Sequence, residues 1–410
     1  MNPRKTLILA LVSVALLAVA LWYSASRRAS EHAALQEPAL PGLLERLPEV
    51  AKVTVTAAGN KVVATLERTD TGWRLAERDF AADADALRQV LLELAEARRV
   101  AAKTARPDLY PRLGVEDLAA EDAKGVQLTI EGGGEPLAVI LGQNAPRGVG
   151  TYMRIPGEAQ SWLIDRNVAV EKSTAGWLDR DLLDIAPERI ARVTVEAGQD
   201  RVEIVASEKE QGDFVLANLP KGREPQSEFV ADATAGFLQG LRIDDVAPAS
   251  ERGPGEAARR ARFHTRDGLD IEVTSFEVDG KPWAQFGVRL DEGRALAWIE
   301  AEQAREKTAW EARQASLDKG EDKVSGGSEG EAPAKSEPAA DAKASATEEV
   351  APEAPLAVRD PAADREQRLA ALRAEVERLA ARFEGRSFQL PGYKAGNLNR
   401  RLEDYLKPKD

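Results

Sequence analysis

Residues 51–76 read AKVTVTAAGNKVVATLERTDTGWRLA, and residues 191–217 read ARVTVEAGQDRVEIVASEKEQGDFVLA. Each stretch alternates or clusters β-branched residues between turn signals, with Gly212 in the second copy at the place of Gly72 in the first. A period of two bounded by turn residues predicts short strands. Both stretches are therefore predicted to be three-stranded meanders, and the second repeats the first 140 residues later.

A helical period follows each meander. Residues 79–100, DFAADADALRQVLLELAEARRV, place apolar side chains on one stripe after Asp83, which is a suitable N-cap. Residues 228–246, EFVADATAGFLQGLRIDDV, keep the Ala-Asp-Ala triplet and are predicted to form the matching helix. One helix per copy would cover one face of a sheet.

Further strands are expected after each helix. They are GVQLTIEG, EPLAVILGQ, GTYMRIPG and QSWLIDR in the first copy, and ARFHTRDG, LDIEVTSFE, KPWAQFGVRL and RALAWIEA in the second. A short helix, AGWLDRDLLDI (residues 175–185), is predicted to close the first copy. This ordered series predicts an α+β chain with two tandem repeats of an antiparallel sheet and covering helix, one at 50–186 and one at 187–310.

The N-terminal segment predicts a membrane anchor. Residues 6–26, TLILALVSVALLAVALWYSAS, carry no charge and lie between basic pairs. As a helix they would span roughly 30 Å, the thickness of a bilayer's hydrocarbon core. We predict a transmembrane helix within residues 1–30, a juxtamembrane linker at 31–49, and a periplasmic location for the rest of a single-pass protein of the bacterial inner membrane. A cleaved signal peptide is the alternative, although its apolar region is usually shorter.

The second copy is expected to be interrupted by an acidic insert at residues 311–362. This stretch has no aromatic residue, 12 acidic and six basic residues, and much Ala, Pro, Ser and Gly. Such a composition predicts disorder. Residues 363–410 then contain a helix with apolar residues at spacings of three and four, followed by an extended piece and a short helix. These apolar residues cover only about two heptads, which is short for a coiled coil. We therefore expect the helix to pack onto the second copy, with a coiled coil as the alternative.

Composition narrows the classes of function. The net charge of −13 and the lack of a basic stripe argue against nucleic acid as a partner. With no cysteine, the chain has no disulfide and no thiolate chemistry. Of its two histidines, His32 falls in the linker and His264 in a predicted strand, where a partly buried or solvated structural role is favoured. We expect no metal site and no cofactor.

Motifs that resemble catalytic signatures lack the context that such chemistry needs. GGSEG at 326–330 fits a serine-hydrolase elbow but lies in the predicted insert, without a strand before it. GPGEAA at 253–258 resembles a dinucleotide-binding loop but follows VAPASER, which predicts no strand. Close carboxylate pairs, such as Asp179 with Asp181, are expected in a chain with 69 acidic residues. The sequence therefore predicts no catalytic residue.

The best candidate for binding is the loop GQNAPRGVGTY, residues 142–152. Its glycines allow close backbone approach, while Asn144, Arg147 and Tyr152 offer hydrogen-bond donors and an aromatic face. An ordinary hairpin connection explains the same residues and is the favoured alternative.

Several of these segments resemble a bacterial family called domain of unknown function 4340. They are the anchor, the meander with GWRL, ADADALRQVLLEL, VILGQNAPRGVGTYMRIPG and WLDRDLLDI, and the likeness covers most of residues 50–310 and the C-terminal tail. The resemblance implies membrane anchoring and gene neighbours that encode gliding-motility-type ABC transporter components. It implies no catalytic residue.

Two classes of function remain open. The preferred hypothesis is a non-enzymatic, membrane-anchored extracytoplasmic protein that contacts transporter subunits as an accessory of an ABC-type transport or gliding-motility-like complex. The alternative is a binding protein for a glycan or small molecule in the cleft between the two modules.

Overall fold

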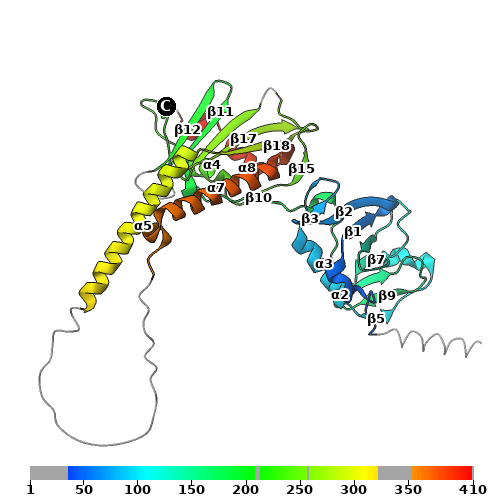
Figure 1. The fold of residues 1–410 in the computed structure, drawn as a ribbon. Coiled ribbons are helices and arrows are strands. Elements are labelled where there is room, and N and C mark those ends of the chain that lie inside the picture. Colours follow the sequence, from blue (N-terminus) through cyan, green and yellow to red (C-terminus); the bar gives the residue numbers. More distant parts are fainter. Residues whose placement is uncertain (1–35, 208–212, 256–257, 322–352, 409–410) are drawn as a thin grey trace, which may run out of the picture. The chain divides into compact units, whose positions relative to one another are not determined.

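The structure is a computed structural model that describes residues 36–207, 213–255, 258–321 and 353–408 (Figure 1). Contacts group the chain into two compact units, with residues up to Arg180 and Asp244–Val246 in the first and Asp181–Ile243 and the chain from Ala247 onward in the second. The predicted anchor at 6–26 lies outside the described residues. Within the described ranges, no helix is both long enough and apolar enough to cross a bilayer.

The first unit is built on a nine-stranded sheet in the order β4-β3-β2-β1-β6-β7-β8-β9-β5. Its strands are β1 (Lys52–Ala57), β2 (Lys61–Thr69), β3 (Gly72–Leu75), β4 (Phe80–Ala81), β5 (Arg99–Ala102), β6 (Val126–Glu131), β7 (Leu137–Asn144), β8 (Thr151–Arg154) and β9 (Ser161–Ile164). Neighbouring strands of this sheet are antiparallel; Val53, for example, pairs with Leu66 and Ile130. All three side chains are buried, so the predicted alternation produces one apolar face.

Helix α3 (Ala84–Glu96) supplies the apolar stripe expected after the meander. The Asp83 side chain accepts a hydrogen bond of 2.8 Å from the Ala86 amide, which confirms the predicted N-cap. The buried side chains of α3 are Leu87, Val90, Leu91, Leu94 and Ala95.

The predicted linker at 31–49 is part of the first unit from residue 36 onward, so this prediction was wrong there. Helix α2 (Leu43–Arg46) contacts α3, and Ala39 and Leu43 are fully buried. Residue 36 also pairs through its backbone amide with the Arg99 carbonyl at 2.7 Å. The short apolar patch in this segment therefore serves the core, because exposed leucine and alanine side chains would leave apolar area in water.

The second unit contains an eight-stranded sheet in the order β13-β12-β11-β16-β17-β18-β19-β15. Its strands are β11 (Ile190–Ala197), β12 (Asp200–Ala206), β13 (Phe214–Leu216), β15 (Asp245–Pro248), β16 (Arg259–Thr265), β17 (Leu269–Val278), β18 (Lys281–Leu290) and β19 (Arg386–Gln389). A separate two-stranded sheet joins β10 (Asp181–Leu183) to β14 (Leu241–Arg242). Both large sheets with their helices confirm the α+β class.

The two large sheets share a strand order over six strands. The sequence β3-β2-β1-β6-β7-β8 in the first corresponds to β13-β12-β11-β16-β17-β18 in the second. The register also corresponds, since Val193 pairs with Ile204 on one side and with Phe263 on the other, as Val53 does with Leu66 and Ile130.

Three local predictions were wrong. The expected helix at 228–246 is reduced to α4 (Asp232–Ala235) and a 3₁₀ turn, Gly236–Leu238, because two glycines interrupt it and Gly240 has a φ of +51°. The expected strand RALAWIEA lies in helix α5 (Glu292–Glu321), whose alanine, glutamate and arginine residues are strong helix formers. The expected helix at 175–185 is a 3₁₀ turn, Thr174–Trp177, followed by strand β10.

The predicted insert at 311–362 was too long at both ends. Its first residues continue α5 to Glu321, and its last ones form α6 (Leu356–Arg359) and the start of α7 (Pro361–Phe383). Residues 322–352, including GGSEG, lie outside the described residues. Composition misled here because alanine and glutamate, which are common in disordered segments, are also favourable in helices.

The C-terminal segment completes the second unit, as predicted. Helix α7 contacts β18 and α5 and lies along the sheet (Figure 1), with Leu372, Leu379 and Phe383 buried. Strand β19 pairs with β18, and helix α8 (Gly392–Leu398) contacts the same strand. The apolar seam of α7 is therefore used within the unit.

Candidate functional site

One face of the second unit's sheet is a ladder of charged side chains. In β16, the polar residues Arg260, Arg262 and His264 alternate with the buried Ala261 and Phe263. The same alternation in β17 and β18 puts further polar residues on this face, namely Asp270, Glu272, Thr274, Gln285 and Arg289. We call these eight residues the polar ladder. Because side chains alternate between faces, the apolar positions of the same strands point to the core.

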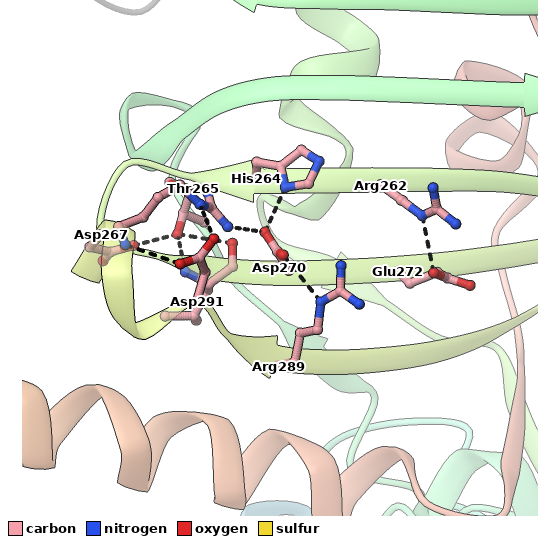
Figure 2. Close-up of polar contacts among 10 residues, drawn as sticks. Arg262, His264, Thr265, Asp267, Asp270, Glu272, Arg289 and Asp291 are labelled. Carbon is pink, nitrogen blue, oxygen red and sulfur yellow. Dashed lines mark hydrogen bonds and ion pairs between the residues drawn. The ribbon is translucent and has the colours of Figure 1, made fainter. Parts of the chain in front are cut away.

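Asp270 is the centre of an ion network at one end of the polar ladder (Figure 2). The His264 Nδ1 lies 2.5 Å from the Asp270 Oδ1, and the Arg289 Nε donates to the Oδ2 at 3.2 Å. Arg294, at the start of α5, also donates to Asp270, and its Nε donates to the Asp291 Oδ2 at 3.0 Å. Only 12% of the Asp270 side chain is exposed, so these contacts are partly shielded from water.

These neighbours set the ionisation of Asp270. Burial by itself would raise the pKa of this carboxyl. The hydrogen bond and charge of His264, the charge of Arg294 and the hydrogen bond from Arg289 outweigh burial, so the pKa of Asp270 lies below its ordinary value. The carboxylate is therefore ionised at neutral pH and holds the cationic groups in place.

The middle of the polar ladder is organised by Glu272. One carboxylate oxygen accepts from the Arg262 Nε at 3.2 Å (Figure 2), and the other forms an ion pair with the Arg260 Nε at 3.0 Å. Each arginine uses one of its five N–H groups there, and the side chains of Arg260 and Arg262 are 51% and 41% exposed. Planar guanidinium groups of this kind suit carboxylates and other planar acceptors of a partner.

A hollow of about 360 Å³ opens on the polar ladder. It is centred on β17 and β18, and Gly287 is exposed within it, where a Cβ atom would meet no other atom within 4 Å. The absence of a side chain at position 287 therefore contributes to the depth of the hollow. The lining residues are Arg262, His264, Asp270, Ile271, Glu272, Thr274, Gln285, Phe286, Gly287, Val288 and Arg289.

His264 contacts Asp270 across the two strands through its ring Nδ1. A carboxylate that orients a histidine is also part of hydrolase triads, where a hydroxyl or thiol must lie next to the other ring nitrogen. Here the cross-strand neighbours of His264 are Arg192 and Asp270. Over the described ranges, no three histidine, aspartate or glutamate side chains are placed to hold a metal ion.

The corresponding face of the first unit is covered by its own chain. Ile140, which takes the register position of Thr274, is buried against Tyr110 and Val115. The Arg154 Nε donates to the Val115 carbonyl at 2.7 Å, and its guanidinium lies 4.6 Å from the Tyr110 ring centre. The covering segment joins β5 to β6 over residues 103–125, whereas residues 249–258 make the shorter connection from β15 to β16.

The predicted binding loop is a connection between β7 and β8. The Asn144 Oδ1 accepts from the Thr151 Oγ1 at 2.8 Å, and Tyr152 packs against the cluster of Tyr110 and Ile140. Arg147 is exposed on the loop. Asn144 and Tyr152 thus contribute to the local structure, and a binding role for the loop stays a prediction.

The other sequence motifs have structural surroundings of their own. Asp83 caps α3, and Asp181 belongs to β10 rather than to the short helix predicted at 175–185. VAP, which was predicted to be outside a strand, is the end of β15. The segment GPGEAA, further along the chain, precedes strand β16. A dinucleotide-binding loop would instead precede a helix.

The polar ladder was not predicted from the sequence, although a signal for it exists. Residues 259–265, RRARFHT, and residues 269–274, LDIEVT, both alternate charged and apolar side chains. Opposite charges fall at paired positions only once the two strands are joined in the observed register, such as Arg262 with Glu272. A solvated or partly buried structural role was predicted for His264, which is half-buried and has Asp270 as its partner.

Comparison with known proteins identifies a family. No curated protein and no solved structure matches this chain. The family model described as a domain of unknown function (DUF4340) matches residues 73–258, from β3 to the residues before β16. This range is narrower than the likeness over residues 50–310 that the sequence suggested. The match over residues 73–258 supports a relationship of this part of the chain to the DUF4340 family.

Proposed function

We propose that this protein is a non-catalytic, membrane-tethered interaction protein, an accessory subunit of an ABC-type transport or gliding-motility-like complex outside the inner membrane. The uncharged segment at 6–26 supports the location, and the transporter genes that the resemblance to the DUF4340 family implies as neighbours support the partner. Tethering would raise the local concentration of the protein for a membrane partner, so that weak contacts suffice.

The observation that carries this proposal is the open polar ladder of the second unit. Its charged groups are paired with one another and half-exposed, with Glu272 and Arg262 each about 41% exposed. In the first unit, residues 103–125 cover the equivalent face. An uncovered face of paired arginines and carboxylates suits a polar protein surface, where charge complementarity gives specificity.

The proposal includes a tandem duplication of one α+β module. The shared order of six strands and the equivalent partners of Val53 and Val193 support it. A duplicated module can keep its core while one copy loses the covering segment, because the covering segment lies outside the sheet. On this view, the first unit is the closed copy and the second presents the interaction surface.

The test combines crosslinking in cells with co-purification of the full-length protein from solubilised membranes. A version without residues 1–30 and the variant Arg260→Glu/Arg262→Glu serve as comparisons. The control is Arg88→Glu, which reverses the charge of an exposed arginine on α3. We expect transporter subunits with the full-length protein and the control, and much less with the other two. Absence of transporter subunits from the full-length sample would make the proposal wrong.

A ligand-binding protein is the second candidate, favoured by the hollow of about 360 Å³ beside Gly287. This volume falls in the range of small-molecule sites, about 300 to 1,000 Å³. Filling the hollow with Gly287→Val should then abolish binding of a small polar ligand, read as loss of its stabilising thermal shift. A glycan fragment or other polar molecule that co-purifies with the wild-type chain and not with this variant would favour the second candidate over the first.

A further inference from the structure

The outer edge of β13 differs between the two units in a way that leaves a strand position open. β13 stands at the end of its sheet, whereas its counterpart β3 is followed by one more strand, β4. The correspondence is defined by register, since Leu75 pairs with Leu66 and Leu216 pairs with Ile204. In the first unit, Phe80 of β4 then pairs with Leu75 and completes the edge.

The residues that would form the missing strand are present but placed elsewhere. FAADA at 80–84 corresponds to FVADA at 229–233. Phe80 is 5% exposed, but Phe229 is 62% exposed and lies in a turn. Leu216 is only half-buried, whereas Leu75, which pairs with β4, is fully buried.

The reason for this displacement is the connection before Phe229. Residues 76–79 join β3 to β4, whereas residues 217–228 lead from β13 to Phe229. This longer connection is held by the C-terminal segment, because the Gln226 amide donates to the Tyr405 carbonyl at 2.8 Å and the Lys407 amide donates to the Glu224 carbonyl at 3.0 Å. Phe229 therefore stays away from the edge that its counterpart closes.

An apolar hollow of about 420 Å³ lies where the strand is missing. Three exposed apolar side chains surround or line it: Val215 at 48%, Leu219 at 40% and Phe229 at 62% exposure. The charged residues among its lining are Asp213 and Glu228, both acidic. Apolar side chains gathered beside an unpaired strand edge are a recurring feature of sites that bind extended peptides.

The backbone of β13 is able to pair on this side. Residues 213, 215 and 217 are directed to β12, since the Ser207 amide donates to the Asp213 carbonyl and the Ala217 amide to the Glu203 carbonyl. The backbone amide and carbonyl groups of the alternate positions, Phe214 and Leu216, point away from β12. The Phe214 amide is satisfied by the Asp232 carboxylate at 3.1 Å, which leaves the Leu216 amide and carbonyl for an incoming strand.

We propose that the edge of β13 binds an extended segment of a partner protein, which adds to the sheet antiparallel to β13, places one large apolar side chain in the hollow and carries a lysine or arginine beside it. Strand β4 of the first unit shows the geometry, a short antiparallel strand with a phenylalanine. The acidic pair Asp213 and Glu228 selects the basic neighbour. The proposal does not depend on which complex the partner belongs to.

The experiment uses the full-length protein in detergent and a fluorescein-labelled peptide, Thr-Lys-Phe-Val-Lys-Thr, followed by fluorescence anisotropy. A peptide with alternate amides N-methylated keeps the side chains and removes the strand hydrogen bonds. Phe229→Asp adds a charge to the hollow, and Tyr393→Asp, at another exposed aromatic residue of the second unit, is the matched control.

We expect saturable binding that is weakened at least about tenfold by Phe229→Asp and by N-methylation, and is unchanged by Tyr393→Asp. Equal binding of the N-methylated peptide would overturn strand addition, and no binding of the unmodified peptide would overturn the peptide site. Self-association that Phe229→Asp removes, seen by light scattering without peptide binding, would show that a second copy of the chain takes the edge instead.

Discussion

At the scale of single residues, Asp270 organises the end of the polar ladder because it accepts from three cationic or protonatable side chains on three elements. His264, Arg289 and Arg294 reach it from β16, β18 and α5. Taking charged groups out of water is costly unless they are paired, so each partner depends on the carboxylate. The pKa of Asp270 is lowered because these partners stabilise its ionised form in the folded state.

Asp270→Asn should therefore destabilise the second unit by about 1 to 3 kcal/mol at pH 7. Because the folded-state pKa is below the ordinary value of 3.8, the carboxylate stabilises the fold above that pH and loses this effect as pH falls through the folded-state value. The difference between wild type and variant should shrink in the same range. Hydrogen exchange of β17 peptides measures it, with the exposed Asp279→Asn in the same hairpin as a control.

Gly268, in the turn between β16 and β17, has a φ of +94° and no room for a side chain. A Cβ atom there would lie 2.7 Å from the Asp291 carbonyl oxygen and 2.8 Å from the Ala295 amide nitrogen. Gly280 has a φ of +71° in open space. Both Gly→Ala changes carry the cost of a left-handed backbone, about 1 kcal/mol.

We expect Gly268→Ala to cost about 1 to 3 kcal/mol more than Gly280→Ala, because only the first adds a steric clash. Thermal unfolding of the two variants measures the difference. Equal midpoints would show that the α5 start moves away freely and that the turn does not position Asp291.

At the scale of elements, the N-terminal cap of α3 depends on residues close to it in sequence, whereas the packing of α7 depends on distant ones. The Asp83 side chain reaches an amide three residues on. Helix α7 instead needs β18 and α5, which are far from it in sequence. The carboxylate of Asp364 in α7 is buried and accepts from the side-chain Nε2 of Gln303 in α5 at 2.8 Å. This hydrogen bond connects the two helices and satisfies a buried polar group.

Asp83→Ala should destabilise the first unit by about 1 kcal/mol, since it leaves an amide at the helix start without its acceptor. Asp85→Ala removes an exposed carboxylate that forms a surface ion pair with Arg88 and should have a smaller effect. Calorimetry of the full chain, followed by hydrogen exchange of the α3 peptide, compares them. The assignment of Asp83 as the cap fails if the two variants are equally stable.

At the scale of the whole molecule, two units with separate cores are joined in one chain, and the DUF4340 match at 73–258 runs from one into the other. Pairing across long stretches of sequence completes the second unit. Strand β19 reaches β18 only after α5, residues 322–352 and α7, where Trp283 pairs with Gln389. The second unit therefore tolerates a long connection at this point, because both ends are fixed by α5 and α7.

Limited proteolysis of the full-length protein should cut first within residues 322–352. Their composition, without aromatic residues and with few large aliphatic ones, predicts that they contribute little to a core. Mass spectrometry of the first fragments identifies the site. Initial cuts within α5 or α7, with 322–352 intact, would contradict the prediction.

The sequence alone determined the features that depend on near neighbours. The meanders at 51–76 and 191–217, the cap at Asp83 and the C-terminal β19 and α8 were predicted, because alternation, turn residues and caps act within a few positions. The same reasoning failed for RALAWIEA, whose apolar residues suit either a short strand or about two turns of a helix. Here the following alanine and glutamate residues continue a helix.

Only the tertiary structure decided which faces and edges are left uncovered. The polar ladder requires three strands in register, so that Glu272 meets two arginines and Asp270 meets His264. The open edge of β13 depends on the hold of the C-terminal segment on residues 224–226. Contacts between residues this far apart are fixed by the packing of the whole unit, because no local pattern along the chain specifies which distant segment arrives at a given face.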